Sequence, residues 1–522
     1  MNSLVSSSLV LPPGYRNMTV SSGIRSAAMR NPGKTALLCG PRSQTYGQLV
    51  EGFNQVANGV IGLGLKAGQN AAIIAYNCLE YIEIVVGVSD TGAAVATPNP
   101  KLTAQEMADI CNDAQARILF VHPECDKVLD RSLLLTVEHV IVIGDEYQAF
   151  KTRAATRYTL PWIPEWATYS IPYTSGTTGK PKGVMLPHRS RSLGCLAYAA
   201  EYGIYSPDDY FLAFAPLCHG AGLTYAIAAI FVGGTTEIVE KFEPEQILRA
   251  VGSGRVTGMF TVPTHYHAIF GLESSILCAH RKHRLNGIIA NAAPLSQSTK
   301  EQIVDYFGDG LLHETYGSTE AGIVSNLRPQ DQLRKINCVG LPFVGNSIRL
   351  LNEQGAEVAP GEVGELFSIS PFMFSGYWGK PEATAEAFGD EGWVGVGDMA
   401  MRDEEGYLYI VDRKKDMVIS GGVNIYPREV EQVLDTHPSV LESAVIGIPD
   451  AQWGELLVAC VVPNAGHAVE PAVLEPFCRA QMASYKLPKQ FVCIDALPRN
   501  ANGKVLKTDL RRWHAQRGNN GF

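Results

Sequence analysis

The chain has 522 residues, of which 46% are hydrophobic and 18% charged, a composition typical of a globular protein with about three to four folding units. Its formal net charge of −9, without a lysine- and arginine-rich run, argues against nucleic acid or an anionic membrane as a partner. The eleven cysteines are odd in number and never spaced as CxxC, which argues against a disulfide framework or a zinc site and favours a reducing compartment.

The sequence contains no evident targeting or membrane segment. Residues 1–13 lack the basic and fully apolar regions of a signal peptide. The longest apolar stretch, residues 221–234, is too short and too rich in glycine to cross a bilayer. We therefore expect a cytoplasmic protein without a membrane span, and leave open whether it is a monomer or a homodimer.

The first 320 residues alternate between helical and strand-like patterns. Apolar residues at helical spacing predict a helix over 46–65, and further helices are predicted over 244–253 and 297–306. Short apolar runs predict the strands 71–75, 118–121, 140–143, 235–239 and 258–261. Strands separated by helices of this length indicate βαβ units and a mostly parallel sheet.

The pattern changes after residue 339. Short strands with frequent glycine and proline turns over 339–409 predict a small β-rich subdomain. The polar cluster 412–416 separates this part from a predicted helix (426–435) and predicted strands (443–448 and 456–462). We predict an N-terminal domain over 1–411, a hinge at 412–416 and a C-terminal α+β domain over 417–522.

The strongest local motif is YTSGTTGKPKG at residues 173–183. Its glycines let backbone N–H groups approach an anion, its hydroxyls add donors, and its lysines add positive charge. The spacing is not that of a Walker A loop. By composition alone the segment fits either a polyphosphate cradle or a surface loop.

Three further segments carry chemistry that is weak when each is taken alone. Residues 316–320 (YGSTE) offer an aromatic ring for a base, a hydroxyl for a phosphate and a carboxylate for Mg²⁺. Residues 393–398 end in Asp398, which suits ribose hydroxyls or an ordinary turn. Residues 498–504 present Lys504 after a glycine, as a catalytic or simply solvated lysine. His313-Glu314 is no zinc motif, because residue 317 is glycine.

Together and in this order, the four segments resemble the ANL superfamily of adenylate-forming enzymes, which includes acyl- and aryl-CoA ligases, adenylation domains and firefly-type luciferases. The resemblance extends over about residues 22–510. It implies an α/β fold with a large N-terminal domain of mostly parallel sheets flanked by helices, a β-rich subdomain, and a small mobile C-terminal α+β domain.

The resemblance also implies how ATP and Mg²⁺ are bound. Tyr316 would stack on adenine, Thr319 would contact the α-phosphate, and Glu320 with Thr174 would bind Mg²⁺. Asp398 and Arg413 would bind the ribose. The other implied nucleotide contacts are Thr174, Ser175, Gly176, Thr177, Thr178, Gly179 and Lys180 at the β- and γ-phosphates, and Asn291, Ala292, Ala293, Gly317 and Ser318 near adenine.

Further implied roles concern catalysis and coenzyme A. Lys504 would offset the repulsion between the substrate carboxylate and the α-phosphate, acting with Thr319, Glu320 and His219. Lys415 would be the hinge about which the C-terminal domain turns between the two half-reactions. The residues expected near coenzyme A are Gly421, Gly422, Trp453 and Lys489; Leu487 departs from the arginine of some relatives.

The acid site is implied by residues 216–222 and 290–294. Its expected lining is His219, Gly220, Ala221, Ala290 and Gly322. Relatives usually carry glycine where this chain has Asn291, which either bonds a substrate polar group or pins the backbone. The small walls leave room for an aromatic ring or a medium acyl chain, and the lack of a buried charge favours an otherwise uncharged acid.

The sequence therefore predicts an AMP-forming acid–CoA ligase acting on a benzoate- or hydroxycinnamate-like acid or a medium-chain acid. No acidic residue over 219–224 could hold a substrate ammonium group, and Gly220 stands where many carrier-loading modules have asparagine. The alternatives are a stand-alone adenylation enzyme that loads a carrier protein and, from another class, a non-catalytic nucleotide-binding protein. Nothing in the sequence points to luciferase-like oxidation.

Overall fold

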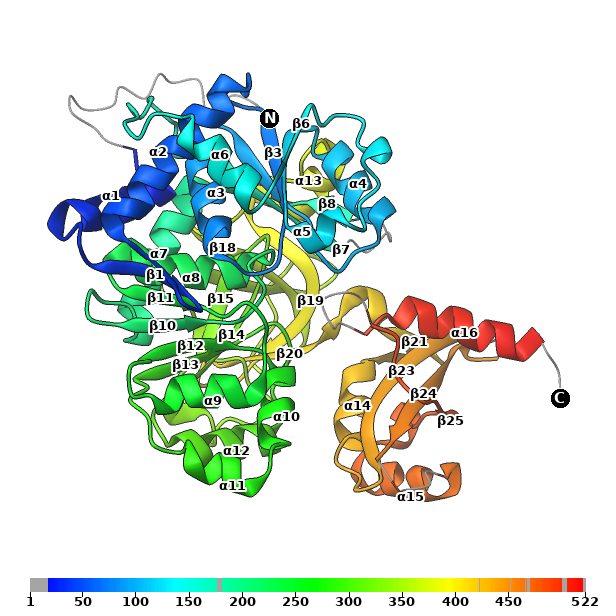
Figure 1. Cartoon of the computed structure of the whole chain (residues 1–522). Coiled ribbons are helices and arrows are strands. Elements are labelled where there is room, and N and C mark those ends of the chain that lie inside the picture. Colours follow the sequence, from blue (N-terminus) through cyan, green and yellow to red (C-terminus); the bar gives the residue numbers. More distant parts are fainter. Residues whose placement is uncertain are drawn as a thin grey trace. The chain divides into compact units, whose positions relative to one another are not determined.

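The computed structural model describes residues 17–175, 181–421, 423–450, 452–464, 466, 470–499 and 505–519 (Figure 1). The contacts between residues divide the chain into two compact units. The first unit consists of Met1–Ile323, Arg328–Ile336 and Ser370–Glu386, and the second of Val324–Leu327, Asn337–Ile369 and Ala387–Phe522.

The first unit contains a mostly parallel sheet in the order β6-β5-β3-β4-β7-β8, with β9 paired to β7. Only β8 and β9 run antiparallel to their neighbour. The strands are β3 (Asn70–Ile74), β4 (Ala94–Thr97), β5 (Ala116–Val121), β6 (His139–Val142), β7 (Thr168–Ser175), β8 (Pro181–Gly183) and β9 (Leu186–Pro187). The helices of this part are α2 (Tyr46–Gly62), α3 (Leu79–Ser89), α4 (Ala104–Asp113), α5 (Pro123–Asp126) and α6 (Asp145–Thr152). Every residue of β3 and β4 is buried, which accounts for their continuous apolar sequence.

To a second sheet the first unit contributes strands in the order β14-β13-β12-β10-β11-β1-β2. All pairings among these strands are parallel except that of β1 with β2. The strands are β1 (Thr35–Cys39), β2 (Arg42–Thr45), β10 (Tyr210–Ala213), β11 (Thr235–Ile238), β12 (Gly258–Thr261), β13 (Gly287–Ala290) and β14 (Leu312–Ser318). The helices are α1 (Val20–Arg30), α7 (His188–Tyr202), α8 (Gly220–Val232), α9 (Pro244–Gly252), α10 (Pro263–Phe270), α11 (Ser274–Ala279) and α12 (Gln297–Phe307), with α13 (Pro381–Ala387) at the unit boundary.

The described residues of the second unit form mostly antiparallel strands, together with helices. One sheet has the strand order β17 (Ser347–Leu351), β18 (Gly364–Ile369), β19 (Val394–Arg402) and β20 (Leu408–Arg413). Another has the order β22 (Val423–Ile425), β21 (Val418–Ser420), β24 (Gly454–Pro463) and β23 (Val440–Asp450). In this second sheet β25 (Gln490–Cys493) pairs parallel with β24. β15 (Gly322–Leu327) pairs antiparallel with β16 (Leu341–Pro342). The helices are α14 (Pro427–Leu434), α15 (Pro471–Gln481) and α16 (Lys507–Asn519).

The predicted α/β fold is confirmed, and the predicted elements recur with shifted ends. The helix expected over 46–65 is α2, and the strand expected over 443–448 is the longer β23. The apolar stretch 221–234 forms most of α8, which is buried over nearly its whole length inside the first unit. Among the helices of the described residues, none has the length and apolarity needed to span a bilayer.

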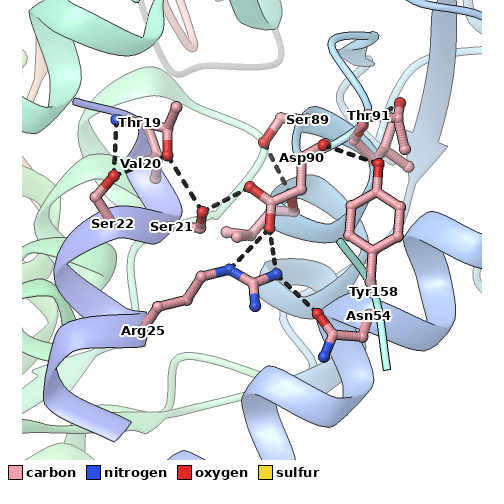
Figure 2. Close-up of polar contacts among 12 residues, drawn as sticks. Thr19, Val20, Ser21, Ser22, Arg25, Asn54, Ser89, Asp90, Thr91 and Tyr158 are labelled. Atoms are coloured by element: carbon pink, nitrogen blue, oxygen red, sulfur yellow. Dashed lines mark hydrogen bonds and ion pairs between the residues drawn. The ribbon is translucent and has the colours of Figure 1, made fainter. Parts of the chain in front are cut away.

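A buried carboxylate anchors the N-terminal helix α1 (Figure 2). Asp90, which is fully buried just after α3, forms an ion pair with Arg25 at 2.6 Å and accepts a hydrogen bond from Ser21 at 2.6 Å. The Arg25 guanidinium also donates to Asn54 of α2, and the Tyr158 hydroxyl donates to the backbone oxygen of Asp90. Burial raises the pKa of Asp90, while Arg25 and Ser21 oppose that rise. These contacts join helices α1, α2 and α3 through one polar centre.

Candidate active site

The segment expected to cradle phosphates is flanked by a β-hairpin stem. β7 and β8 pair antiparallel with Thr174 opposite Lys182 and Ser175 opposite Pro181. The residues between the two strands, namely Gly176, Thr177, Thr178, Gly179 and Lys180, lie outside the described residues. The stem is tied down because the Tyr173 hydroxyl donates to Asp113 Oδ2 at 2.7 Å. The two arms that carry the expected loop are therefore held at the edge of a sheet.

Residues 316–322 form a tight turn that only glycine permits at two positions. β14 ends at Ser318 and β15 begins at Gly322. A Cβ at Gly317 would lie 2.1 Å from the backbone oxygen of Gly322, and Gly322 itself has φ +72°. The Ser318 hydroxyl accepts from the backbone N–H of Ala321 at 3.0 Å. The turn thereby presents Thr319 and Glu320 together.

Two residues that the sequence analysis did not select hold this turn. The Tyr377 hydroxyl donates to Glu320 Oε1 at 2.9 Å. The buried Arg191 guanidinium donates to the backbone oxygens of Thr319 and Phe372 at 3.3 and 3.5 Å. Neither residue belongs to a motif with a chemical signature of its own, so only their contacts reveal them.

The expected acid-binding segment faces the same turn. His219 immediately precedes α8, and a Cβ at Gly220 would lie 3.8 Å from Thr319 Cγ2. Burial lowers the pKa of His219 to about 4. Its imidazole is therefore neutral at pH 7, so it can line a carboxylate by hydrogen bonding but supplies no positive charge.

Asn291 is committed to contacts within the protein. Its side-chain amide donates to Thr315 Oγ1 at 2.7 Å, and its Oδ1 accepts from the backbone N–H of Ala292. Ala292 has φ 78°, a left-handed conformation that costs free energy in a residue with a Cβ. Of the two readings of Asn291, this geometry favours backbone pinning.

A buried ion pair supports the strand that leads to Tyr316. Lys300 Nζ and Glu314 Oε2 lie 2.5 Å apart, and Lys300 is 1% exposed. Glu314 Oε1 also accepts from the backbone N–H of Leu295 at 3.2 Å. These contacts tie together β14, α12 and the loop after β13.

The remaining predicted residues of the first unit differ in exposure. Those that are half-buried are Thr174, His219, Gly220, Ala221, Asn291, Tyr316, Gly317, Ser318, Thr319 and Glu320. Ala290 and Gly322 are buried, whereas Ala292 and Ala293 are exposed. Partial exposure suits side chains that must meet a ligand.

In the second unit the expected ribose ligands are neighbours. Asp398 on β19 is paired in register with Arg413 on β20, and Arg413 Nε lies 3.0 Å from Asp398 Oδ1. Lys415 is exposed in the short 3₁₀ turn Lys414–Asp416 that follows. The adjacent Asp416 lies 3.5 Å from Arg511 of α16.

Three of the residues expected near coenzyme A lie together on the second unit. Gly421, with φ +58°, donates its backbone N–H to the Trp453 oxygen at 2.8 Å, and a Cβ there would lie 3.1 Å from the indole ring. Lys489 Nζ lies 5.7 Å from the centre of the Trp453 ring, and all three residues are exposed. Gly422 and Lys504 lie outside the described residues.

The residues at the turn fit a magnesium ion shared with ATP. Within the described part of the chain, Glu320 Oε1 is bonded by Tyr377, while Oε2 has neither a hydrogen-bond partner nor an ion pair. Mg²⁺ commonly uses one or two carboxylates together with substrate phosphates and water. The described residues contain no group of three or more His, Cys, Asp or Glu side chains that could hold a metal ion.

The comparisons with known proteins identify the family. The model of the AMP-binding enzyme family matches residues 24–378, and that of the AMP-binding enzyme C-terminal domain matches residues 429–504. The feruloyl-CoA synthase of Amycolatopsis sp is 35% identical over 508 residues, covering 95% of this chain and 99% of the relative. The 2-succinylbenzoate–CoA ligase of Geobacillus kaustophilus is 33% identical over 498 residues, covering 95% and 98%. The crystal structure of ATP-bound MatB from Rhodopseudomonas palustris aligns with a TM-score of 0.87 at 30% identity, covering 95% and 99%.

The chain belongs to the AMP-binding enzyme family, in the acyl- and aryl-CoA ligase branch of the ANL superfamily. It is an AMP-forming acid–thiol ligase whose cosubstrates are ATP and coenzyme A. The predicted family, fold class and type of reaction are thereby confirmed.

Proposed function

We propose that the acid is an aryl acid of the benzoate or hydroxycinnamate type, with medium-chain acids as the second class. The observation that carries this proposal is the acid-binding segment, where Gly220 faces Thr319 and the neighbouring His219 is neutral. A site with small walls admits an aromatic ring. The similarity to a feruloyl-CoA synthase and a 2-succinylbenzoate–CoA ligase favours the aryl class.

The reaction has two steps. The substrate carboxylate attacks the α-phosphorus of ATP, so an acyl–O–P bond forms and pyrophosphate leaves. The coenzyme A thiolate then attacks the acyl carbon, so a thioester forms and AMP leaves. In the first step two anions meet, which is why fixed positive charge and a metal ion at the phosphates lower the barrier.

We assign Lys504 to the bridge between carboxylate and α-phosphate, and Glu320, with Thr174, to Mg²⁺. The turn geometry supports Thr319 as the α-phosphate contact, because the strand that carries Tyr316 leads directly into it. The Asp398–Arg413 pair supports the ribose role of both residues. The exposed group of Gly421, Trp453 and Lys489 supports a coenzyme A surface.

The hinge and the cellular setting belong to the same proposal. We place the hinge at 412–416, with Lys415 as the pivot between residues 1–411 and 417–522. The eleven cysteines, all of them among the described residues, form no disulfide, which suits the reducing cytoplasm. The partners are the acid, ATP and coenzyme A; a nucleic acid partner is not proposed, and monomer and homodimer are both compatible.

The test is pyrophosphate release from ATP and Mg²⁺ across a panel of aryl, hydroxycinnamic, short-, medium- and long-chain acids, with and without coenzyme A. We expect coenzyme A-dependent turnover with an aryl acid. Lys504→Ala should lower the adenylation rate by about 10²–10³-fold, because it removes a cation from the transition state. The control Lys127→Ala changes an exposed lysine of the first unit and should leave the rate unchanged.

The other outcomes identify the alternatives. Pyrophosphate release that is indifferent to coenzyme A, together with transfer to a carrier protein, would replace the proposal by a carrier-loading enzyme. ATP binding without release of pyrophosphate in the presence of any acid of the panel would favour a non-catalytic nucleotide-binding protein. Turnover restricted to medium-chain acids would overturn the aryl assignment while leaving the ligase activity in place.

A further inference from the structure

We propose that Tyr377 is a positioning residue that aims the Glu320 carboxylate at the metal and couples it to the stem of the phosphate loop. The proposal deepens the proposed function, since it rests on the metal-binding role of Glu320. All residues that carry it lie in the first unit.

The central contact is the hydrogen bond from the Tyr377 hydroxyl to Glu320 Oε1, at 2.9 Å. A carboxylate with one oxygen bonded to a fixed donor has a defined plane and a defined free oxygen. Here that oxygen is Oε2, which has no partner among the described residues. Residues that hydrogen-bond a metal-binding carboxylate commonly set both its orientation and its affinity for the metal.

The Tyr377 ring is itself held from two sides. Lys182 Nζ lies 5.1 Å from the ring centre, and the Phe374 ring packs edge-on at 5.1 Å. Lys182 stands opposite Thr174 in the hairpin stem. The same tyrosine therefore touches the stem through its ring and Glu320 through its hydroxyl.

Backbone hydrogen bonds fix the segment that carries Tyr377. The Trp378 N–H donates to the Gly183 oxygen at 2.8 Å, and the Met185 N–H donates to the Gly376 oxygen at 2.9 Å. On the other side, the Phe374 N–H donates to the Glu320 oxygen at 2.8 Å. The segment thus bridges the continuation of the stem and the turn that holds Glu320.

Asp113, at the end of α4, locks the outer part of this bridge. Its carboxylate accepts from the Tyr173 hydroxyl at 2.7 Å and pairs with Lys380 at 3.0 Å, and its backbone oxygen accepts from the Trp378 indole at 3.1 Å. Asp113 therefore bonds both the hairpin stem and the segment that carries Tyr377. A shift of the stem would move the ring, and through the hydroxyl the carboxylate.

The decisive variant is Tyr377→Phe, which removes the hydroxyl and keeps the ring over Lys182. We would measure ATP binding by calorimetry at a series of Mg²⁺ concentrations, and pyrophosphate release over the same series. We expect the Mg²⁺ concentration for half-maximal effect to rise roughly 10- to 100-fold in both. Thioester formation from preformed acyl-adenylate and coenzyme A releases no pyrophosphate. Its rate in Tyr377→Phe should therefore stay within roughly twofold of the wild-type rate.

Two further variants make the test specific. Tyr210→Phe removes another tyrosine–glutamate hydrogen bond, from Tyr210 to Glu237 Oε2 at 2.5 Å, and should not change the Mg²⁺ dependence. Glu320→Gln should itself raise the Mg²⁺ concentration for half-maximal effect. Adding Tyr377→Phe to it should raise that concentration little further, because the two residues act as one unit.

An unchanged Mg²⁺ dependence of Tyr377→Phe would overturn the proposal. So would an equal loss in both half-reactions together with a lower melting temperature, since that pattern marks a purely structural tyrosine. If Glu320→Gln leaves the Mg²⁺ dependence unchanged while the wild type still forms adenylate, the metal role of Glu320 and this proposal both fail. The acid–CoA ligase function would then stand unaffected.

Discussion

Gly317 lies in the turn of residues 316–322, where the backbone leaves no room for a side chain. The atoms that a side chain would meet there are the backbone oxygen and carbon of Gly322 and the Cα of Ile323, at 2.1, 3.0 and 3.0 Å. Backbone atoms cannot move aside by changing rotamer. Any side chain at this position must displace the turn that carries Thr319 and Glu320.

We therefore predict that Gly317→Ala lowers adenylation by roughly 10²-fold, because a displacement of about 1 Å suffices for such a loss. The rate of pyrophosphate release and the KM for ATP check this. The control Gly194→Ala lies within α7, where the nearest atom to a new Cβ is 3.5 Å away. It should keep full activity and gain about 0.5–1 kcal/mol of stability. Normal ATP kinetics in Gly317→Ala would contradict the constraint.

Thr319, Glu320 and Asp398 became candidates at the level of sequence because they lie in motifs that resemble those of the ANL superfamily. Tyr377 and Arg191 did not. Tyr377 acts on Glu320 across 57 positions of sequence, and Arg191 on Thr319 across 128. Hydrogen bonds of this kind depend on which segments the fold brings together, and no local pattern records them.

At the scale of elements, the start of α7 carries a buried histidine that makes stability depend on pH. His188 is 0% exposed, and its Nδ1 accepts from the backbone N–H of Val20 at the start of α1. Burial lowers the pKa of His188 to about 4, from the ordinary value near 6.5. A protonated imidazole would also face the positive end of the α7 dipole.

The direction in which pH changes the stability follows from proton binding at His188. Below about pH 6.5 His188 is protonated in the unfolded chain but stays neutral in the folded chain. The folded state therefore loses stability as the pH falls toward 4. The full loss is about 3 kcal/mol for this one group. We predict that the fall in melting temperature between pH 7 and pH 4.5 is smaller in His188→Gln than in wild type.

The exposed His267 supplies the matched control, because His267→Gln should leave the pH slope of the melting temperature unchanged. Burial also lowers the pKa of His265 to about 4, so His188→Gln should remove only part of the acid sensitivity. Equal pH slopes in wild type and His188→Gln would contradict the assignment.

Elements were predicted best where their sequence periodicity reflects burial. α2 follows the helical pattern of 46–65, and the apolar runs at 71–75 and 118–121 fall on β3 and β5. The ends were less accurate. β23 extends to Val440–Asp450 because it pairs along its whole length with β24, a partner that its own sequence does not reveal.

For the whole molecule, the proposed hinge makes one prediction about the two half-reactions. Lys415→Pro fixes one backbone torsion in the exposed turn Lys414–Asp416. If the C-terminal part must turn about this residue between steps, thioester formation should slow by roughly tenfold or more relative to adenylation. Separate assays of pyrophosphate release and of thioester formation from preformed adenylate give the ratio.

Lys415→Ala removes the charge and leaves the torsion free, so its ratio of the two rates should equal that of the wild type. A wild-type ratio in Lys415→Pro would show that the pivot lies elsewhere. A changed ratio in Lys415→Ala would show that the side chain, and not the backbone, is what matters.

The amino-acid sequence alone was sufficient for the family, the α/β class and the cosubstrates, because four local motifs occur in the order in which they occur in the ANL superfamily, and that resemblance implies the rest. Tertiary structure was needed to show that Asn291 bonds Thr315 and Ala292, that His219 is neutral, and that Tyr377 joins Glu320 to the hairpin stem. These properties arise from burial and from contacts between segments distant in sequence. Both depend on how the chain packs, so they become visible only in the folded molecule.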